Sequence, residues 1–103
     1  MIRFTLHSTG GQITGFSCSG HAGYAEKGSD IVCAAVSVLT TTCVNALESV
    51  AGEKPHVIAK DGQMILKLPK ESGHDAQVIL RSLWQGMRDL AEEYPPYLVL
   101  NES

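Results

Sequence analysis

The 103-residue sequence has few charged side chains and no cluster of basic ones. Only 18% of its residues are charged, and the net charge is −3. Direct binding to nucleic acid is not expected, because neutralising phosphates requires clustered Lys and Arg. The first residues lack a basic segment followed by an apolar stretch, and no apolar run has the length that a membrane span requires. We therefore expect a cytoplasmic protein without membrane contact.

Cysteines are also scarce, and none form a CxxC pair. The sequence has three, an odd number that fits a reducing compartment better than a disulfide framework. Cys18 falls on the apolar face of an expected strand, and Cys43 falls on the apolar stripe of an expected helix. Both are therefore predicted to be core thiols.

Hydrophobic residues make up 44% of the chain, enough for one compact core, so residues 1–103 are expected to form a single domain. Alternating apolar residues bounded by turn residues predict strands, and apolar residues at spacings of three and four predict helices. The expected strands cover residues 2–7, 13–19, 55–60, 63–68 and 97–100, and the expected helices cover 31–50 and 75–94. This ββαββαβ order predicts a two-layer α+β fold, with both helices packed on one face of a mainly antiparallel sheet.

The segment GHAGYAEKGSDIVCAAVS, residues 20–37, places a His at the end of a strand and a Cys in the first turn of a helix. If Asp30 is the helix N-cap, Cys33 occupies the third helical position. Unpaired backbone N–H groups and the helix dipole favour an anion there, and the thiolate is the reactive form of Cys. The same N–H groups are also candidates to bind the oxyanion of an attacked carbonyl. Cys33 is therefore the candidate nucleophile.

His21 is the candidate base, because an imidazole accepts and returns a proton near neutral pH. Asp30 has a second possible role besides capping, which is to orient His21 as the third member of a triad. Ser37 lies one turn after Cys33 on the same helix face, where it would line a substrate site.

Other uses of these residues are less favoured. A lone Cys near a helix start is usually a packing residue, and a His after a strand is usually a solvated polar one. Zinc binding by Cys18, His21 and Cys33 is disfavoured, because residues three apart on a strand face opposite sides and no fourth ligand is evident. No metal and no cofactor are expected.

The GHA at residues 20–22 and the unbroken DIVCAAVS at residues 30–37 resemble the motifs of the ribosomal-processing cysteine proteases (Prp), small bacterial proteins. The resemblance implies that Cys33 is the nucleophile and His21 its catalytic partner, with Asp30 and Ser37 as supporting residues. It also implies a substrate, because family members remove a short N-terminal extension from a large-subunit ribosomal protein, cutting after a pair of aromatic residues. Family members look like homodimers.

The loop before the Cys is thought to be mobile in this family and to order around the substrate; here it is Ala22 to Ser29. Gly23 and Gly28 bracket its centre and give it permissive hinges at both ends. They are the expected substrate-loop residues.

Two alternatives to a protease remain open. One is a non-catalytic ribosome-associated factor that binds peptides, in which Cys33 is only a small side chain without a chemical role. The other is a thiol redox or sensor protein, which the absence of a resolving Cys on the same element makes less favoured.

Overall fold

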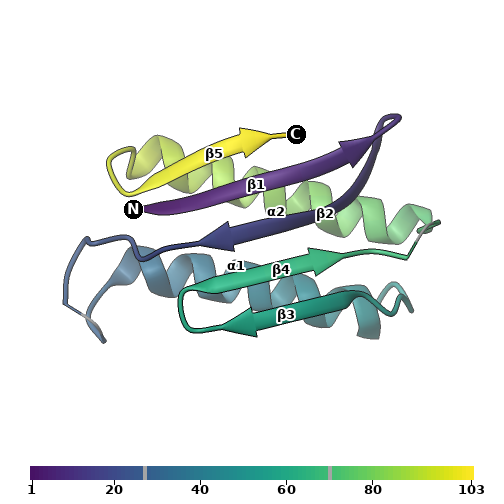
Figure 1. The fold of residues 1–103 in the computed structure, drawn as a ribbon, viewed down its shortest axis with the longest axis horizontal. Coiled ribbons are helices and arrows are strands. Elements are labelled where there is room, and N and C mark those ends of the chain that lie inside the picture. Colours follow the sequence, from purple (N-terminus) through teal and green to yellow (C-terminus); the bar gives the residue numbers. More distant parts are fainter. Residues whose placement is uncertain (27, 70) are drawn as a thin grey trace.

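The computed structural model describes residues 1–26, 28–69 and 71–103. The elements in chain order are β1 (Ile2–Thr9), β2 (Gln12–Ser19), α1 (Ile31–Ser49), β3 (His56–Lys60), β4 (Gln63–Lys67), α2 (His74–Glu93) and β5 (Leu98–Glu102). Both helices lie on one face of the sheet (Figure 1). The predicted two-layer α+β fold and its ββαββαβ order are confirmed.

The sheet has five strands in the order β3-β4-β2-β1-β5. Neighbouring strands run antiparallel except β1 and β5, which are parallel. Because β2 is central, its last residue, Ser19, pairs with Arg3 on one side and Gln63 on the other. The end of β2 is therefore held between two strands at the point where the chain leaves the sheet toward α1.

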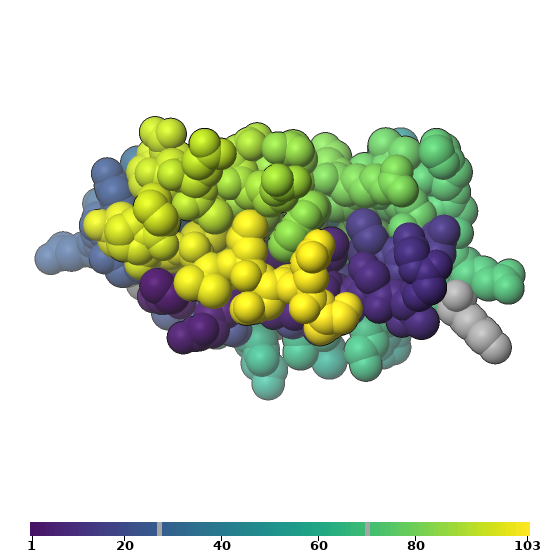
Figure 2. Space-filling view, turned by 90° about the horizontal axis from the view of Figure 1, so that it is seen from above, coloured from purple at the N-terminus to yellow at the C-terminus, as the bar shows by residue number. Residues whose placement is uncertain are grey.

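The sheet face beneath the helices is apolar. Ile2, Phe4 and Leu6 are buried on β1 and alternate with more exposed residues, as the period of two predicts. Phe4 stacks on Phe16 of β2 with ring centroids 5.2 Å apart, and Trp84 of α2 lies 6.1 Å from Phe4. Figure 2 shows α2 packed along the edge of the sheet that β5 and β1 form. Each such side chain contributes about 1.5–3 kcal/mol of burial free energy.

Helix α1 buries one stripe of side chains, namely Val32, Val36, Thr40, Cys43 and Leu47. Thr40 is the polar member of this stripe, and its hydroxyl donates to the carbonyl of Val36 at 2.9 Å, which satisfies the polar group inside the core. The helix was expected to reach residue 50 but ends at Ser49, and Val50 is exposed.

Helix α1 is also long and apolar enough, by length and composition alone, to cross a membrane. The expectation that no segment reaches this length was therefore wrong. A helix that buries one side in the core of a globular domain meets the same criteria. Its buried stripe packs between α2 and the sheet, and its other side is exposed.

Helix α2 packs through Ala76, Gln77, Leu80, Leu83 and Met87. Ile79 and Leu90 lie at the margin of this buried stripe and are only partly buried. Its polar member is Gln77, whose side-chain amide bonds both the N–H and the C=O of Ile13, at 2.8 and 2.9 Å. It clamps the start of β2 to the helix.

Candidate active site

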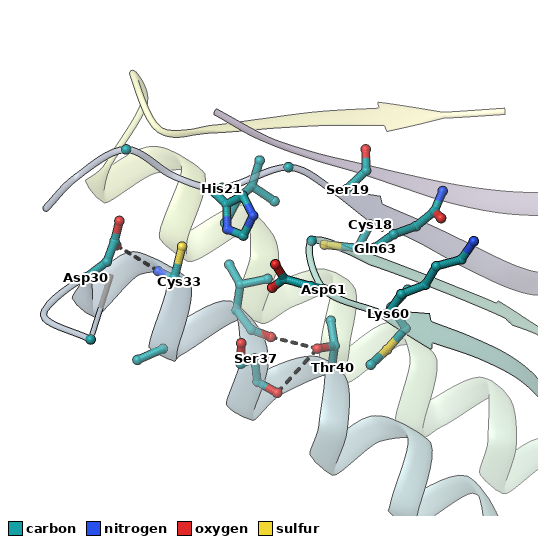
Figure 3. A pocket seen from close by; sticks show the side chains of 18 of the residues that line it. Cys18, Ser19, His21, Asp30, Cys33, Ser37, Thr40, Lys60, Asp61 and Gln63 are labelled. Carbon is teal, nitrogen blue, oxygen red and sulfur yellow. Dashed lines mark hydrogen bonds between the residues drawn. The ribbon is translucent and has the colours of Figure 1, made fainter. Parts of the chain in front are cut away.

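A groove of about 660 Å³ opens where the end of β2, the first turns of α1 and the β3–β4 turn come together (Figure 3). Its lining includes all the site residues that the sequence predicted, namely His21, Gly23, Gly28, Asp30, Cys33 and Ser37. The chain between His21 and Cys33 folds back across the start of α1, and Figure 3 shows the imidazole and the thiol facing the same groove. Sequence spacing permitted this arrangement without establishing it.

Asp30 is the N-cap of α1. One carboxylate oxygen accepts the N–H groups of Val32 and Cys33 at 3.0 and 2.9 Å, and the other accepts those of Tyr24 and Ala25 at 3.0 and 3.4 Å. These hydrogen bonds, that of Cys33 foremost, hold the pKa of the Asp30 carboxyl below its usual range against the opposing effect of burial. A charged Asp30 therefore ties the start of the helix to the preceding loop.

Two possibilities at this helix start are narrowed by the structure. The amides of Val32 and Cys33 both donate to Asp30, so these two N–H groups are not free for an oxyanion. Asp30 was also considered as the group that orients His21, yet both of its oxygens are engaged by backbone N–H groups. The structure thus supports the capping role of Asp30.

Cys33 is half-buried beside the buried stripe of α1. Its sulfur accepts a hydrogen bond from the backbone N–H of Ala22 at 3.3 Å. An N–H donor at this position lies where negative charge develops on the sulfur when it acts as a nucleophile. Ala22 itself is buried.

Two glycines allow the backbone to pack closely on either side of His21. Gly20 has φ +94°, and a Cβ there would lie 2.3 Å from the carbonyl oxygen of Met1, so only Gly fits between β2 and the imidazole-bearing residue. The N–H of Gly20 donates to the carbonyl of Gly62 at 2.8 Å. A Cβ on Gly62 would lie 3.0 Å from Nε2 of His21. The β3–β4 turn therefore lies directly against the ring of His21.

Ser37 and the two glycines of the expected substrate loop also line the groove. Ser37 is exposed on the turn of α1 that follows Cys33. Gly23 and Gly28 have φ values of +73° and +92°, which side chains rarely adopt. Their left-handed backbone gives the loop its course over the helix start.

The other two cysteines differ from each other. Cys43 is buried, which raises the pKa of its thiol to about 12, and the prediction of a core thiol is confirmed. Cys18 is only half-buried and lines the groove, so its prediction as a core thiol was wrong. Burial, and then the neighbouring Cys33, raise the pKa of Cys18 to about 11.

The sequence interpretation missed the part of the groove that β3 and β4 provide. Lys60, Asp61, Gly62 and Met64 line it. The expected strands at residues 55–60 and 63–68 do form a hairpin here, joined by Asp61 and Gly62. Its position beside His21 follows from the pairing of β4 with β2, and nothing local to the turn signals that partner.

Comparison with known proteins gives consistent matches in sequence and in fold. A family model described as Cysteine protease Prp matches residues 1–99. The ribosomal processing cysteine protease Prp of Staphylococcus aureus is 31% identical over 93 residues, which cover 88% of this chain and 88% of that protein.

Solved structures of the protease Prp from S. aureus have the same fold. The complex with a covalently linked product peptide matches with a TM-score of 0.95 and 29% identity, covering 100% of both chains. The complex with a substrate peptide matches with a TM-score of 0.89 and 28% identity, again covering 100% of both chains. The similarity therefore extends over the full length of the fold described above.

Proposed function

Because this chain belongs to the cysteine protease Prp family, we propose that residues 1–103 form one protease domain that removes a short N-terminal extension from a large-subunit ribosomal protein. Family membership makes the chain a cysteine protease, and the relative from S. aureus is named for ribosomal processing. The observation that best supports this proposal is that His21 and Cys33 line one groove beside an N–H donor to the thiol.

In this proposal, Cys33 is the nucleophile and His21 its base. The sulfur bonds to the carbonyl carbon of the scissile peptide while its proton passes to His21. The C–N bond then breaks, and His21 returns the proton to the leaving amine. Water, activated by the same imidazole, hydrolyses the thioester and releases the new carboxylate and the free thiol. No metal and no cofactor take part.

The supporting residues act through position. Asp30 caps the helix and holds the loop, and Ser37 lines the groove next to Cys33. Gly23 and Gly28 provide the backbone freedom with which the loop follows a bound peptide. The partner is thus the precursor of a ribosomal protein, bound as an extended peptide.

The same proposal places the protein in the cytoplasm, without direct contact to nucleic acid or membrane, as a homodimer. A net charge of −3 supports the absence of nucleic-acid contact. The exposed side of α1 supports self-association: residues 31–47 include no charged side chain, although Ile31 is 51% and Val38 64% exposed. An uncharged, partly apolar helix face matches a second copy of itself.

The proposal is tested with a peptide that has two aromatic residues before Ala-Ser. Wild-type protein under reducing conditions should cleave it after the aromatic pair. Cys33→Ala and Cys33→Ser should each lower kcat/KM by at least about 1,000-fold, because the covalent step is lost. Liquid chromatography with mass spectrometry identifies the cut and gives the rate.

Cys43→Ala is the matched control, because it removes a thiol that lies in the core. It should lower stability but retain cleavage. Equal cleavage by the Cys33 variants would remove this residue from the mechanism. Tight peptide binding by wild type without cleavage would favour the alternative, a non-catalytic ribosome-associated peptide-binding factor.

A further inference from the structure

A cluster of three tyrosines lies at the loop that precedes α1. The ring of Tyr24 meets Tyr94 and Tyr97 edge to face, with centroids 5.7 and 5.1 Å apart and interplanar angles of 84° and 77°. Tyr24 is 41% exposed, so its ring is not part of the core. Figure 2 shows the loop, in blue, beside the turn between α2 and β5.

The other two tyrosines form a stable platform. Tyr94 follows the last residue of α2, and Tyr97 precedes β5, with Pro95 and Pro96 between them. The N–H of Tyr97 donates to the carbonyl of Tyr94 at 3.0 Å, which closes the turn. The carbonyl of Tyr97 accepts the N–H of Ile2 at 2.9 Å. Two fixed proline φ angles and two backbone hydrogen bonds therefore hold the platform to the sheet.

A short stretch of chain links this platform to the thiol. Tyr24 is two residues after Ala22, whose N–H donates to the Cys33 sulfur at 3.3 Å. The backbone N–H of Tyr24 donates to Asp30 at 3.0 Å, so backbone and ring each anchor the loop from a different side. Glycine at position 23 gives the backbone between Ala22 and Tyr24 more conformational freedom than another residue would. Contacts outside this stretch are therefore needed to hold its conformation.

We infer that Tyr24 is a positioning residue, whose ring on Tyr94 and Tyr97 holds the amide of Ala22 against the Cys33 thiol. The inference builds on the proposed function, since it concerns the same nucleophile. Edge-to-face aromatic pairs stabilise their arrangement beyond the area they bury. Releasing the ring allows the Ala22 amide to move away, and the thiolate loses its donor.

The test compares Tyr24→Ala with Tyr24→Phe, which retains the ring and loses only the hydroxyl. Iodoacetamide alkylation of Cys33 is followed from pH 6 to pH 9 by peptide mapping. In Tyr24→Ala the midpoint of the rate–pH profile should move to higher pH, so that alkylation below the midpoint slows by about tenfold relative to the plateau. Tyr24→Phe should behave as wild type.

The midpoint is the informative quantity, because easier access to the thiol scales the rate at every pH alike. The titratable groups that line the groove with Cys33 remain the same in both variants, namely Cys18 on β2, His21 after β2, Asp30 at the cap, and Lys60 and Asp61 at the β3–β4 hairpin. With the cleavable peptide, kcat should fall by about tenfold in Tyr24→Ala while KM stays within about twofold.

A double-mutant cycle with Tyr94→Ala assigns the effect to the ring contact. The double variant should lose little more than Tyr24→Ala alone, whereas fully additive losses would show that the rings act independently. An unchanged midpoint together with unchanged kcat in Tyr24→Ala would overturn the inference. If wild type cleaves no peptide, the proposed function fails, yet the alkylation profiles still decide the role of Tyr24.

Discussion

The three cysteines are chemically alike, and their surroundings make them different. Cys33 receives an N–H from Ala22 at the mouth of a groove, Cys18 lies half-buried in the same groove, and Cys43 is enclosed between the helices and the sheet. Burial raises the pKa of Cys18 to about 11 and that of Cys43 to about 12. Only the thiolate reacts with an alkylating agent, so the raised pKa values of Cys18 and Cys43 slow the reaction of these two thiols.

We expect Cys33 to alkylate first at pH 8, followed by Cys18 and then Cys43. Cys18 and Cys43 should react more slowly because burial raises the pKa of both thiols. Timed iodoacetamide labelling of the folded protein, read by peptide mapping, measures the order. Labelling in urea is the control and should make the three rates similar. Faster modification of Cys18 or Cys43 than of Cys33 in the folded protein would contradict the assignment.

At the scale of elements, single side chains determine how the segments are joined. Asp30 joins α1 to the loop before it, and Gln77 joins α2 to the start of β2. Asp30 accepts N–H groups at the start of α1, and Gln77 pairs with the N–H and the C=O of Ile13 on β2. Each side chain thus satisfies backbone groups that the helix or strand leaves unpaired. Their loss therefore affects the connection between elements more than the elements themselves.

Asp30→Asn should weaken the protein in a way that depends on pH. The amide retains one oxygen acceptor, but its NH₂ group cannot accept the N–H groups of Tyr24 or Ala25. Because the folded-state pKa of Asp30 is lowered, its stabilising contribution is fully present above about pH 4 and is lost as the pH falls through the folded value. Urea unfolding at pH 7, 5, 4 and 3 should show a wild-type advantage that shrinks below pH 4.

Asp75→Asn is the control, because it makes the same charge change on an exposed residue in the first turn of α2. A wild-type advantage over Asp30→Asn that persists undiminished at pH 3 would argue against a charged cap. Slower peptide cleavage by Asp30→Asn at pH 7 is also expected, since the loop that bears the Ala22 donor loses one anchor.

Gln77→Leu should lower the free energy of unfolding by about 2–6 kcal/mol. The variant leaves the N–H and the C=O of Ile13 buried without partners, and each unmade hydrogen bond costs about 1–3 kcal/mol. Gln85→Leu is the matched control on the exposed side of the same helix and should change stability by less than about 0.5 kcal/mol. Urea titrations followed by circular dichroism give both values, and equal stabilities for the two variants would refute the clamp.

At the scale of the whole molecule, one helix serves both the site and the surface. The N-terminal end of α1 presents Cys33 to the groove, its buried stripe packs in the core, and its outer side is uncharged up to residue 47. Exposed helix faces are normally rich in charged residues. The outer side of α1 is therefore the surface on which the proposed homodimer is best tested.

Val38→Lys should shift the protein toward the monomer in sedimentation velocity at a fixed concentration. In a symmetric interface, each buried Lys loses its hydration and lies near the same charge on the partner copy. Both effects disfavour association. Val78→Lys makes the same change on the exposed side of α2 and should leave the sedimentation coefficient as in wild type. A wild type that sediments as a monomer would remove the homodimer from the proposal.

The local part of this protein could be predicted from sequence, because it depends on neighbours in the chain. Alternation in β1, the Asp61-Gly62 turn and the Asp30 cap involve residues a few positions apart, and all agree with the structure. The position of Cys33 in the first turn of α1 follows from the cap. These features required only the periods of helix and strand and the chemistry of helix ends.

The tertiary structure alone decided what those local features do together. It brought the turn at Gly62 against His21, turned Cys18 into the groove, and used the amides of Val32 and Cys33 for the cap. These outcomes depend on which strands pair and on which donors are already taken, and both involve contacts between distant parts of the chain. The sequence by itself therefore determined the elements and a thiol at a helix start, whereas the surroundings of that thiol followed from the packing of the sheet, the loop and the helices.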